Sequence, residues 1–473
     1  MSVSTFTSKP GITPLPCTSP CWKYVVGIID ECCSALKETS SKPSVVESDL
    51  IVDVISKISS FVSACSKSRI LKTGTDDEFK GILKKLTVEK VDLTRFKGFI
   101  DECLPKEKRG AFVSFLLSLV KDLPKEFPDG NLETLNQGCN GTVVLSRRQV
   151  AVLLTNAVFG TYAIVGIKFS FSLILAKQRP KTFGILHYLE RFFDAETKGS
   201  PLKGNISVIR IVGRETPSTI FEGSEKKLCN VVFEIDRGIE AMQGMIQTDF
   251  ANKYIGGGVL RNGNTQEEIR FGVFSPECLV SLLVAGEPML DNEAIIITGC
   301  EKFSMCRGYF RWITDFRDFK DTTPTVDDGS LDVTIVAIDA MNVREDPRVQ
   351  FERDNITREI YKAYLGFSAD PRVSSKPVAT GKWGCGVFHN DVELKFVQQW
   401  IACSAVDSGP SPRVMHFHTF HKKETAKELR QLMDKIRGQG IDTVGRLYEY
   451  ALHFTPSSPV PPPKKRGRKS KDN

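Results

Sequence analysis

The sequence lacks the cysteine patterns of a disulfide framework or a zinc site. Its thirteen cysteines are scattered, Cys32 and Cys33 form the only adjacent pair, and no Cys-x-x-Cys is followed by a matching second pair. An apolar signal core is missing too, because the first residues are rich in Ser, Thr and Pro. These absences argue against a secreted, disulfide-bonded protein and predict reduced thiols in a nuclear or cytosolic one.

The net positive charge is small outside the last ten residues. The formal net charge is +7, of which +5 comes from six basic residues and one acid at the C-terminus, so the rest of the chain carries only +2. A body this close to neutral gives no sign of a broad nucleic-acid surface. With 473 residues, 41% of them apolar, the chain is long enough for two or three domains with their own cores.

One apolar run, residues 150–176, is long enough to cross a bilayer. Polar residues interrupt it at Thr155, Asn156 and Lys168, and Gly160 breaks it as well. Two shorter helices, or a helix and a turn, explain the run equally well. We expect a buried helical core, because buried elements are usually shorter than a membrane span.

The composition and the spacing of apolar residues divide the chain into four segments. Residues 1–20 are predicted to be disordered, and residues 21–200 to form an all-helical domain, because apolar residues recur at helical spacing, for example from Ile51 to Val62. The polar stretch 196–204, with Gly and Pro, is the predicted boundary. Residues 201–455 alternate short β-branched runs with helical stretches, which predicts an α/β domain with a largely parallel sheet. Residues 456–473 are a proline spacer and a basic tail.

The expected elements of the α/β part can be placed by residue number. Strands are predicted at residues 206–212, 231–235, 294–298, 333–338 and 414–420, and helices at residues 276–284, 350–366, 391–405 and 423–437. Ligands of such sheets bind at the carboxyl ends of the strands.

The basic tail is read most simply as a nuclear localisation signal, carried by Lys464, Lys465, Arg466, Arg468 and Lys469 after a stiff proline spacer. Arg466-Gly467-Arg468 is also similar to an AT-hook, whose arginines enter the minor groove of DNA. A single copy would bind DNA weakly, so nuclear import is the main expectation and weak DNA contact the alternative.

Three adjacent glycines, Gly256, Gly257 and Gly258, are followed after seven residues by Gln266, Glu267 and Glu268. Adjacent glycines allow positive φ and bring backbone N–H groups close to a ligand. The two carboxylates supply general acid and base capacity nearby. Because adjacent side chains point in different directions, the two glutamates cannot face one bond as a paired glycosidase dyad and must have different roles.

This pattern, with Asp249 to Ile255 before it and Ile269-Arg270-Phe271 after it, resembles the signature of the poly(ADP-ribose) glycohydrolases. The similarity continues through residues 297–299, Gly308-Tyr309, residues 337–340, residues 362–364 and residues 378–386, and more loosely through residues 145–193. The resemblance implies an α/β fold with a macrodomain-like mixed sheet flanked by helices, preceded by an all-helical accessory domain. It also implies hydrolysis of ribose–ribose O-glycosidic bonds without a cofactor or a metal.

The resemblance also assigns roles to residues. Glu268 would protonate the leaving oxygen and then deprotonate water, which implies retention of configuration. Glu267 and Asn252 would bind the ribose, with Asp249 as a supporting acid. The remaining expected substrate contacts surround the diphosphate and the adenine: Gly256, Gly257, Gly258, Gln266, Gly384, Cys385, Gly386, Ile239, Glu240, Tyr309 and Phe420. The alternative is that residues 266–268 are simply a solvated helix start, where acids favour the helix dipole.

Two departures from the family pattern stand out. Related enzymes commonly carry two glycines and Asp where this chain has His389-Asn390-Asp391, so bulkier residues could narrow the site there. A family tyrosine three positions before Tyr309 is replaced by Cys306. These changes motivate a second hypothesis, a catalytically weakened ADP-ribose-binding module, and the basic tail alone motivates a third, a DNA-tethered chromatin protein.

Three histidines, His416, His418 and His421, lie close enough in sequence to bind zinc. No Cys or acid nearby completes the set, so a half-buried strand with polar partners is the main expectation. The expected partners are poly(ADP-ribose) and the proteins that carry it, with no membrane, and the protein is expected to be a monomer.

Overall fold

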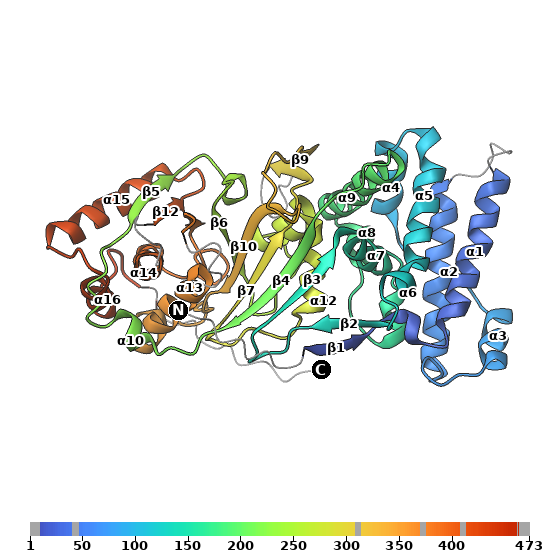
Figure 1. Cartoon of the computed structure of the whole chain (residues 1–473), viewed down its shortest axis with the longest axis horizontal. Coiled ribbons are helices and arrows are strands. Elements are labelled where there is room, and N and C mark those ends of the chain that lie inside the picture. The colour runs from blue at the N-terminus through green and yellow to red at the C-terminus, as the bar shows by residue number, and fades with distance from the viewer. Residues whose placement is uncertain are drawn as a thin grey trace.

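The computed structural model describes residues 10–39, 47–307, 314–368, 375–406, 413–460 and 462. Figure 1 shows a central sheet between two groups of helices. The N-terminal group contains α1 (Trp22–Thr39), α2 (Glu47–Lys67), α3 (Asp76–Lys84), α4 (Thr94–Cys103), α5 (Lys106–Lys121), α6 (Leu123–Glu126), α7 (Arg147–Val158), η2 (Thr161–Val165), α8 (Ser172–Lys177) and α9 (Arg179–Thr197).

The run 150–176 is a buried core, as expected. It is divided among α7, η2 and α8, and Gly160 and Gly166 bound the short middle helix with positive φ of 68° and 79°. Ser146 caps α7 in a capping box with Gln149. No helix in the described ranges combines the length and the apolar character that crossing a membrane requires.

The expectation that residues 1–20 are disordered is wrong for the described part of that segment. β1 (Gly11–Pro14) pairs antiparallel with β2 (Asn131–Thr134), and η1 (Pro16–Thr18) follows it. The pairing explains the order, because a terminal segment gains fixed backbone hydrogen bonds when it adds a strand to another segment. The N-terminal half is therefore not purely helical.

The main sheet is mixed, as the resemblance implies. Its strand order is β3-β4-β7-β10-β6-β11-β12-β5, in which β3, β4, β7 and β10 are antiparallel neighbours, and β10, β6, β11, β12 and β5 are parallel neighbours. The bounds are β3 (Gly141–Ser146), β4 (Asn205–Val212), β5 (Asn230–Glu234), β6 (Ile246–Ala251), β7 (Glu293–Gly299), β10 (Leu331–Asp339), β11 (Val378–Gly381) and β12 (Val414–His418), and a separate pair contains β8 (Ser304–Arg307) and β9 (Thr314–Asp318).

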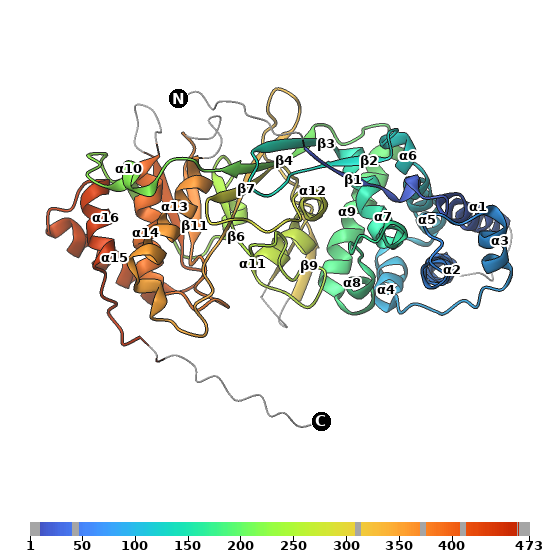
Figure 2. The ribbon, with the colours of Figure 1, turned by 90° about the horizontal axis from the view of Figure 1, so that it is seen from below.

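Helices after the boundary cover the sheet and surround its ends. They are α10 (Pro217–Phe221), η3 (Ile239–Ala241), α11 (Gln266–Ile269), η4 (Arg270–Phe274), η5 (Pro276–Val280), α12 (Ser281–Val284), η7 (Val349–Phe351), α13 (Arg353–Ser368), α14 (Val392–Ala405), α15 (Lys423–Gly438) and α16 (Val444–Leu452). Figure 2 shows α13, α14, α15 and α16 on the side of the sheet away from α1 to α9.

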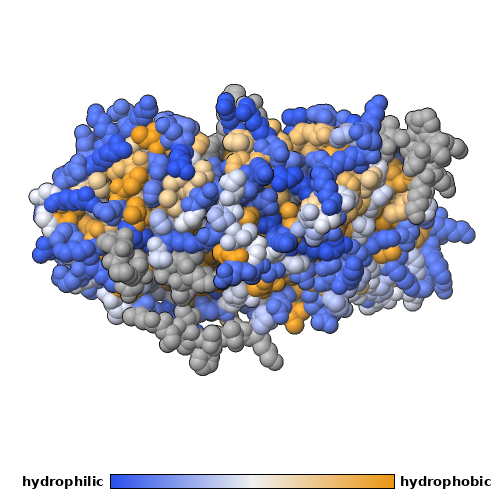
Figure 3. Space-filling view, turned by 45° about the horizontal axis from the view of Figure 1, so that its top comes forward, coloured by the Kyte–Doolittle hydropathy of each residue, from blue (hydrophilic) through white to orange (hydrophobic). Residues whose placement is uncertain are grey.

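Alternate residues of the buried strands face different cores. Ile295 and Ile297 of β7 belong to the core that also holds the N-terminal helices, whereas Ala294 and Ile296 belong to the core around α13 and α14. The first core is one continuous cluster from Leu15 to Ala337. The helical half therefore shares its core with one face of the sheet. The view in Figure 3 shows a mostly hydrophilic surface with smaller hydrophobic groups.

Candidate active site

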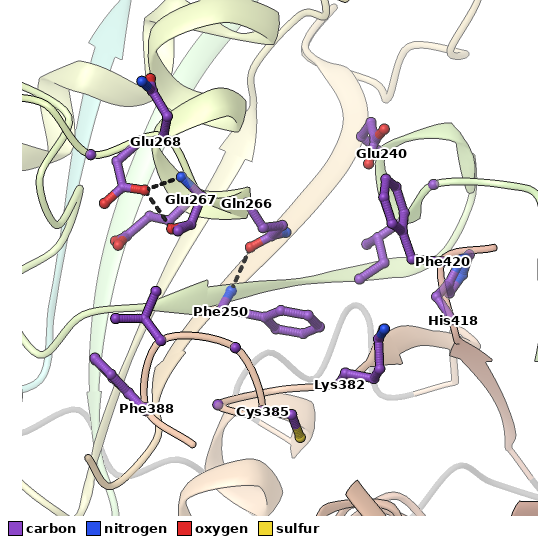
Figure 4. A pocket seen from close by; sticks show the side chains of 18 of the residues that line it. Glu240, Phe250, Gln266, Glu267, Glu268, Lys382, Cys385, Phe388, His418 and Phe420 are labelled. Carbon is purple, nitrogen blue, oxygen red and sulfur yellow. Dashed lines mark hydrogen bonds between the residues drawn. The ribbon is translucent and has the colours of Figure 1, made fainter. Parts of the chain in front are cut away.

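A cavity of about 1090 Å³ opens at the carboxyl ends of β6, β11 and β12. The residues that follow these strands line it, as expected for an α/β sheet. They lie on five segments: residues 237–240, the end of β6 with Asn252, residues 262–268, Lys382 with residues 384–388 and Val392, and the end of β12 with the residues after it. Figure 4 shows Glu267 and Glu268 on one side of this cavity and Glu240, Phe420 and His418 on another.

Glu267 and Glu268 both line the cavity from the first turn of α11, and they have different hydrogen-bond partners. Glu267 accepts from the Gly256 N–H (2.6 Å) and the Asn252 N–H (3.0 Å). Glu268 accepts from the Gly258 N–H (2.9 Å), the Thr265 N–H (2.7 Å) and the Thr265 hydroxyl. The reading as a helix start is correct in part, because Thr265 and Glu268 form a capping box, but both glutamates are buried, with 2% and 7% exposure.

The three glycines use their N–H groups within the loop. Gly256 and Gly258 donate to the two glutamates, and Gly257 donates to the Tyr254 carbonyl (3.0 Å). A Cβ on Gly257 would lie 2.5 Å from Glu267 Oε2 and 2.8 Å from Glu268 Oε1, and its φ is +50°. The expected contact of these N–H groups with a diphosphate is therefore replaced in this structure by contacts to the carboxylates. Gly257 is needed because both carboxylates approach its Cα, whereas a Cβ on Gly256 would meet the Leu282 side chain.

Asp249 lies within β6 and does not line the cavity; it is 1% exposed, and its carboxyl oxygens accept no hydrogen bond from the described residues. Burial raises its pKa to about 8, with Glu268 adding to the rise and Arg270 opposing it. Burial also raises the pKa of Glu267 well above its usual value, with further contributions from Asp249 and Glu268. Burial and neighbouring negative charge thus favour the protonated forms of Asp249 and Glu267, which lie beside Glu268.

Gln266 and Asn252, two further residues of the signature, form hydrogen bonds next to the two glutamates. Gln266 accepts from the Phe250 N–H (2.8 Å) and donates to the Thr248 carbonyl (3.1 Å), which ties α11 to β6 (Figure 4). The Asn252 side chain lines the cavity and accepts from the Tyr254 N–H (3.1 Å).

The second glycine loop also reaches the cavity. Gly384, Cys385 and Gly386 line it, and the N–H groups of Gly386 and Val387 make no hydrogen bond within the described part of the chain. Free N–H groups in a loop form an anion-binding concavity, so this loop retains the capacity to bind a diphosphate.

The expectation that His389 and Asn390 narrow the site is wrong. Neither lines this cavity. Asn390 is buried and its amide donates to the Met341 carbonyl (2.7 Å) and the Gly384 carbonyl (3.0 Å), whereas His389 is exposed with φ +61°. Asn390 therefore holds the glycine loop from behind.

The expected adenine end is formed in part by described residues. Ile239 and Glu240 on η3 line the cavity together with Phe420, whose φ is +51°. Cys306 does not line it. Tyr309 lies outside the described residues.

Sequence reasoning missed Lys382 and assigned no ligand to His418, although both line the cavity. The Lys382 ammonium makes no hydrogen bond or ion pair with any residue that the structure describes. Burial lowers its pKa, Cys385 opposes this, and Lys422 adds to it. A cation without a protein partner, in a cavity, is suited to an anionic ligand. Its position directly after β11 was the signal that could have identified it.

The histidine cluster has polar partners, as expected. His416 contacts Glu234 (2.9 Å), His421 contacts Asp236 (3.4 Å), and His418 contacts the Arg237 carbonyl (2.8 Å). No group of three metal-ligating side chains occurs among the described residues. The thirteen cysteines, all of them within the described residues, form no disulfide bond.

Two models of one protein family match consecutive parts of the chain. The model described as Poly (ADP-ribose) glycohydrolase (PARG), helical domain, matches residues 106–210, and the model described as Poly (ADP-ribose) glycohydrolase (PARG), Macro domain fold, matches residues 218–427. Together they cover about two thirds of the chain.

Curated relatives carry the same name. Poly(ADP-ribose) glycohydrolase 1 of Caenorhabditis elegans is 32% identical over 65% of this chain and 39% of its own length, and glycohydrolase 2 of that organism is 34% identical over 59% of each. Probable poly(ADP-ribose) glycohydrolase 2 of Arabidopsis thaliana is 28% identical over 78% of this chain and 80% of its own length. The chain thus spans 39% and 59% of the two C. elegans relatives. On these matches, and with a helical half followed by a mixed sheet, the chain belongs to the poly(ADP-ribose) glycohydrolase family.

Proposed function

We propose that this protein hydrolyses the ribose–ribose O-glycosidic bonds of poly(ADP-ribose) and releases ADP-ribose. The observation that carries the proposal is the pair of buried glutamates at the cavity, each held by N–H groups of the glycine loop. Such fixed carboxyl groups supply the acid and base that glycoside hydrolysis requires. The names of the relatives support the same substrate.

In this mechanism Glu268 protonates the oxygen that leaves the scissile bond, while the departing ribose becomes oxocarbenium-like. Water then attacks the ribose, and the Glu268 carboxylate takes the proton from that water. Because one residue acts on one face in both steps, the configuration is retained. Glu267 orients the ribose, Asp249 supports the pair from beneath, and the loop at residues 384–386 binds the diphosphate.

The test is Glu268→Gln beside the matched variant Glu267→Gln. We expect Glu268→Gln to lose at least about a hundredfold of the hydrolysis rate, because an amide cannot donate the proton, while calorimetry shows ADP-ribose binding within a few-fold. Retention of more than about a tenth of the rate would move the acid role elsewhere, with Glu267 first in line. Binding of ADP-ribose by wild type without any turnover would identify a binding module instead.

We also propose that the basic tail directs nuclear import, with polymer-modified nuclear proteins as partners. The tail lies outside the described residues, and its support is its composition. Deletion of residues 461–473 should move the protein to the cytoplasm in microscopy and leave hydrolysis of free polymer nearly intact. Loss of turnover at physiological salt would indicate instead that the tail captures polymer or DNA.

A further inference from the structure

His418 ends β12 at the wall of the cavity, beside Phe420 (Figure 4). Its side chain is buried, with 5% exposure. The Nδ1 atom lies 2.8 Å from the Arg237 carbonyl oxygen, which can only accept, so Nδ1 carries the hydrogen. A neutral imidazole has one N–H, so Nε2 is then an acceptor.

Nε2 of His418 is buried and has no hydrogen-bond partner in the part of the chain that the structure describes. A buried acceptor without a partner is unfavourable, and in native proteins it commonly marks a site completed by a ligand or water. Burial lowers the pKa of His418, which keeps the ring neutral near pH 7, although the Arg237 carbonyl, Glu234 and Glu240 oppose the shift. His416 favours the neutral form as well.

The neighbours of His418 in the cavity indicate what completes it. Glu240, on η3, lines the same end and presents a carboxylate, which when ionised only accepts. Two residues with acceptor groups, from different elements, thus line the side of the cavity where Phe420 also lies (Figure 4). This arrangement fits a group with two donor hydrogens and disfavours a group that itself accepts.

We propose that His418 is a specificity-determining contact whose Nε2 accepts a hydrogen bond from the adenosine half of the ligand. This inference rests on the proposed function. The donor is either the exocyclic amino group of adenine, which could also reach Glu240, or a hydroxyl of the adenosine ribose. Replacing the amino group by a carbonyl, as in the hypoxanthine analogue, would set an acceptor against His418 and Glu240.

The variant His418→Asn tests this directly. Asparagine can keep a donor to the Arg237 carbonyl but removes the acceptor at the position of Nε2, whereas His418→Gln restores an amide oxygen there. His416→Asn is the matched control, because His416 pairs with Glu234 and does not line the cavity. The ligands, measured by calorimetry, are ADP-ribose, inosine diphosphate ribose, and ADP-ribose lacking the adenosine 2′- or 3′-hydroxyl.

We expect wild type and His416→Asn to prefer ADP-ribose over the hypoxanthine analogue by about tenfold or more. His418→Asn should reduce that preference to about threefold or less. His418→Gln should recover part of it. If His418→Asn instead loses the preference for ADP-ribose over a deoxy analogue, His418 is still a hydrogen-bond acceptor, and the donor is the ribose hydroxyl. Equal weakening of every ligand by His418→Asn would overturn the proposal, because it would indicate a structural role alone.

Acid provides a second readout. Protonation of His418 converts Nε2 from acceptor to donor, so ADP-ribose binding should weaken and the penalty of the hypoxanthine analogue should shrink as pH falls below the usual histidine pKa of 6.5, because burial lowers the pKa of His418. Arg237, Glu234, Glu240, His416, Lys382 and Lys422 are the charged or titratable groups around it. The same pH response in His418→Asn would overturn the assignment. Since binding is measured without turnover, absence of hydrolysis would reject the proposed function and leave this test intact.

Discussion

Asp249 combines complete burial with a carboxyl group that has no hydrogen-bond donor among the described residues. Its pKa of about 8 lies above the usual value of 3.8, so the folded chain keeps a proton that the unfolded chain releases. The stabilising contribution of this group is therefore complete below about pH 4 and is lost as pH rises towards 8. Asp249→Asn, which cannot ionise, should become more stable relative to wild type across that window.

Urea unfolding at pH 5, 6.5 and 8 measures this difference. Asp434→Asn, at an exposed position of α15, is the control and should track wild type at each pH. A difference between Asp249→Asn and wild type that stays constant with pH would contradict the raised pKa.

Lys382 adds a cation to a cavity in which backbone N–H groups are otherwise the expected phosphate contacts. Lys382→Met should weaken ADP-ribose binding about tenfold or more, because a hydrogen bond to a charged group contributes about 1.5–3 kcal/mol. Adenosine, which has no phosphate, should bind both proteins equally. The measurement is calorimetry at two salt concentrations.

Lys423→Met controls for the loss of one positive charge, since Lys423 begins α15 and does not line the cavity. If adenosine weakens as much as ADP-ribose, Lys382 supports the wall of the cavity and does not contact phosphate.

The sequence identified the acids because they lie in one fixed pattern of spacing. Glu267 and Glu268 follow the glycines after a fixed interval, and the structure brings them together with Asn252 at the cavity. Lys382 and His418 belong to no such pattern. Each follows or ends a different strand, and only the parallel pairing of β11 and β12 brings them to one cavity.

At the scale of elements, His389 and Asn390 lie in the loop between β11 and α14. In the sequence they stand out as one feature, whereas in the structure they have different roles. Asn390→Ala should destabilise the protein by about 1–3 kcal/mol, because it removes the donor to two carbonyls, and should weaken ADP-ribose binding by loosening residues 384–386. His389→Gly should stabilise it by up to about 1 kcal/mol, because a non-glycine residue at φ +61° is strained. Thermal unfolding and calorimetry of both variants check this.

The reverse order, in which Asn390→Ala is neutral and His389→Gly weakens binding, would mean that the histidine and not the asparagine supports the loop.

Elements were predictable where one physical signal dominated. The strands β4, β5, β7, β10 and β12 and the helices α13, α14 and α15 lie within a few residues of the expected ranges. β6 escaped prediction because Gln247, Thr248 and Asp249 make a central, buried strand look polar, and β11 because it is only four residues long. β3 was hidden in a half that reads as helical, yet it pairs with β4 at the sheet edge.

At the scale of the whole molecule, the helical half reaches the segment between the three glycines and α11 through Lys181 of α9. This fully buried side chain donates to the Val259 carbonyl (2.9 Å) and the Arg261 carbonyl (3.0 Å). Lys181→Met should lower kcat by about tenfold or more, because the loop that holds Glu267 and Glu268 loses two hydrogen bonds. ADP-ribose binding should change less, because most of its expected contacts come from other loops.

Lys108→Met is the matched control, because Lys108 of α5 pairs with Glu190 (2.6 Å) and Asp194 (2.7 Å) within the helical half. Steady-state kinetics with polymer and calorimetry with ADP-ribose distinguish the two. Equal losses in both variants would attribute the effect to general destabilisation of the helices.

The core that runs from Leu15 to Ala337 also determines when the chain can fold during its synthesis. Chains grow from the N-terminus, and domains generally fold as they emerge from the ribosome. Here α7 and α9 pack against η4 and η5, so their apolar faces are not fully covered until residues 270–280, past the midpoint of the chain, have been made. A ribosome stalled before residue 270 would therefore display a helical half with exposed apolar surface on α7 and α9, which is the kind of surface that chaperones bind.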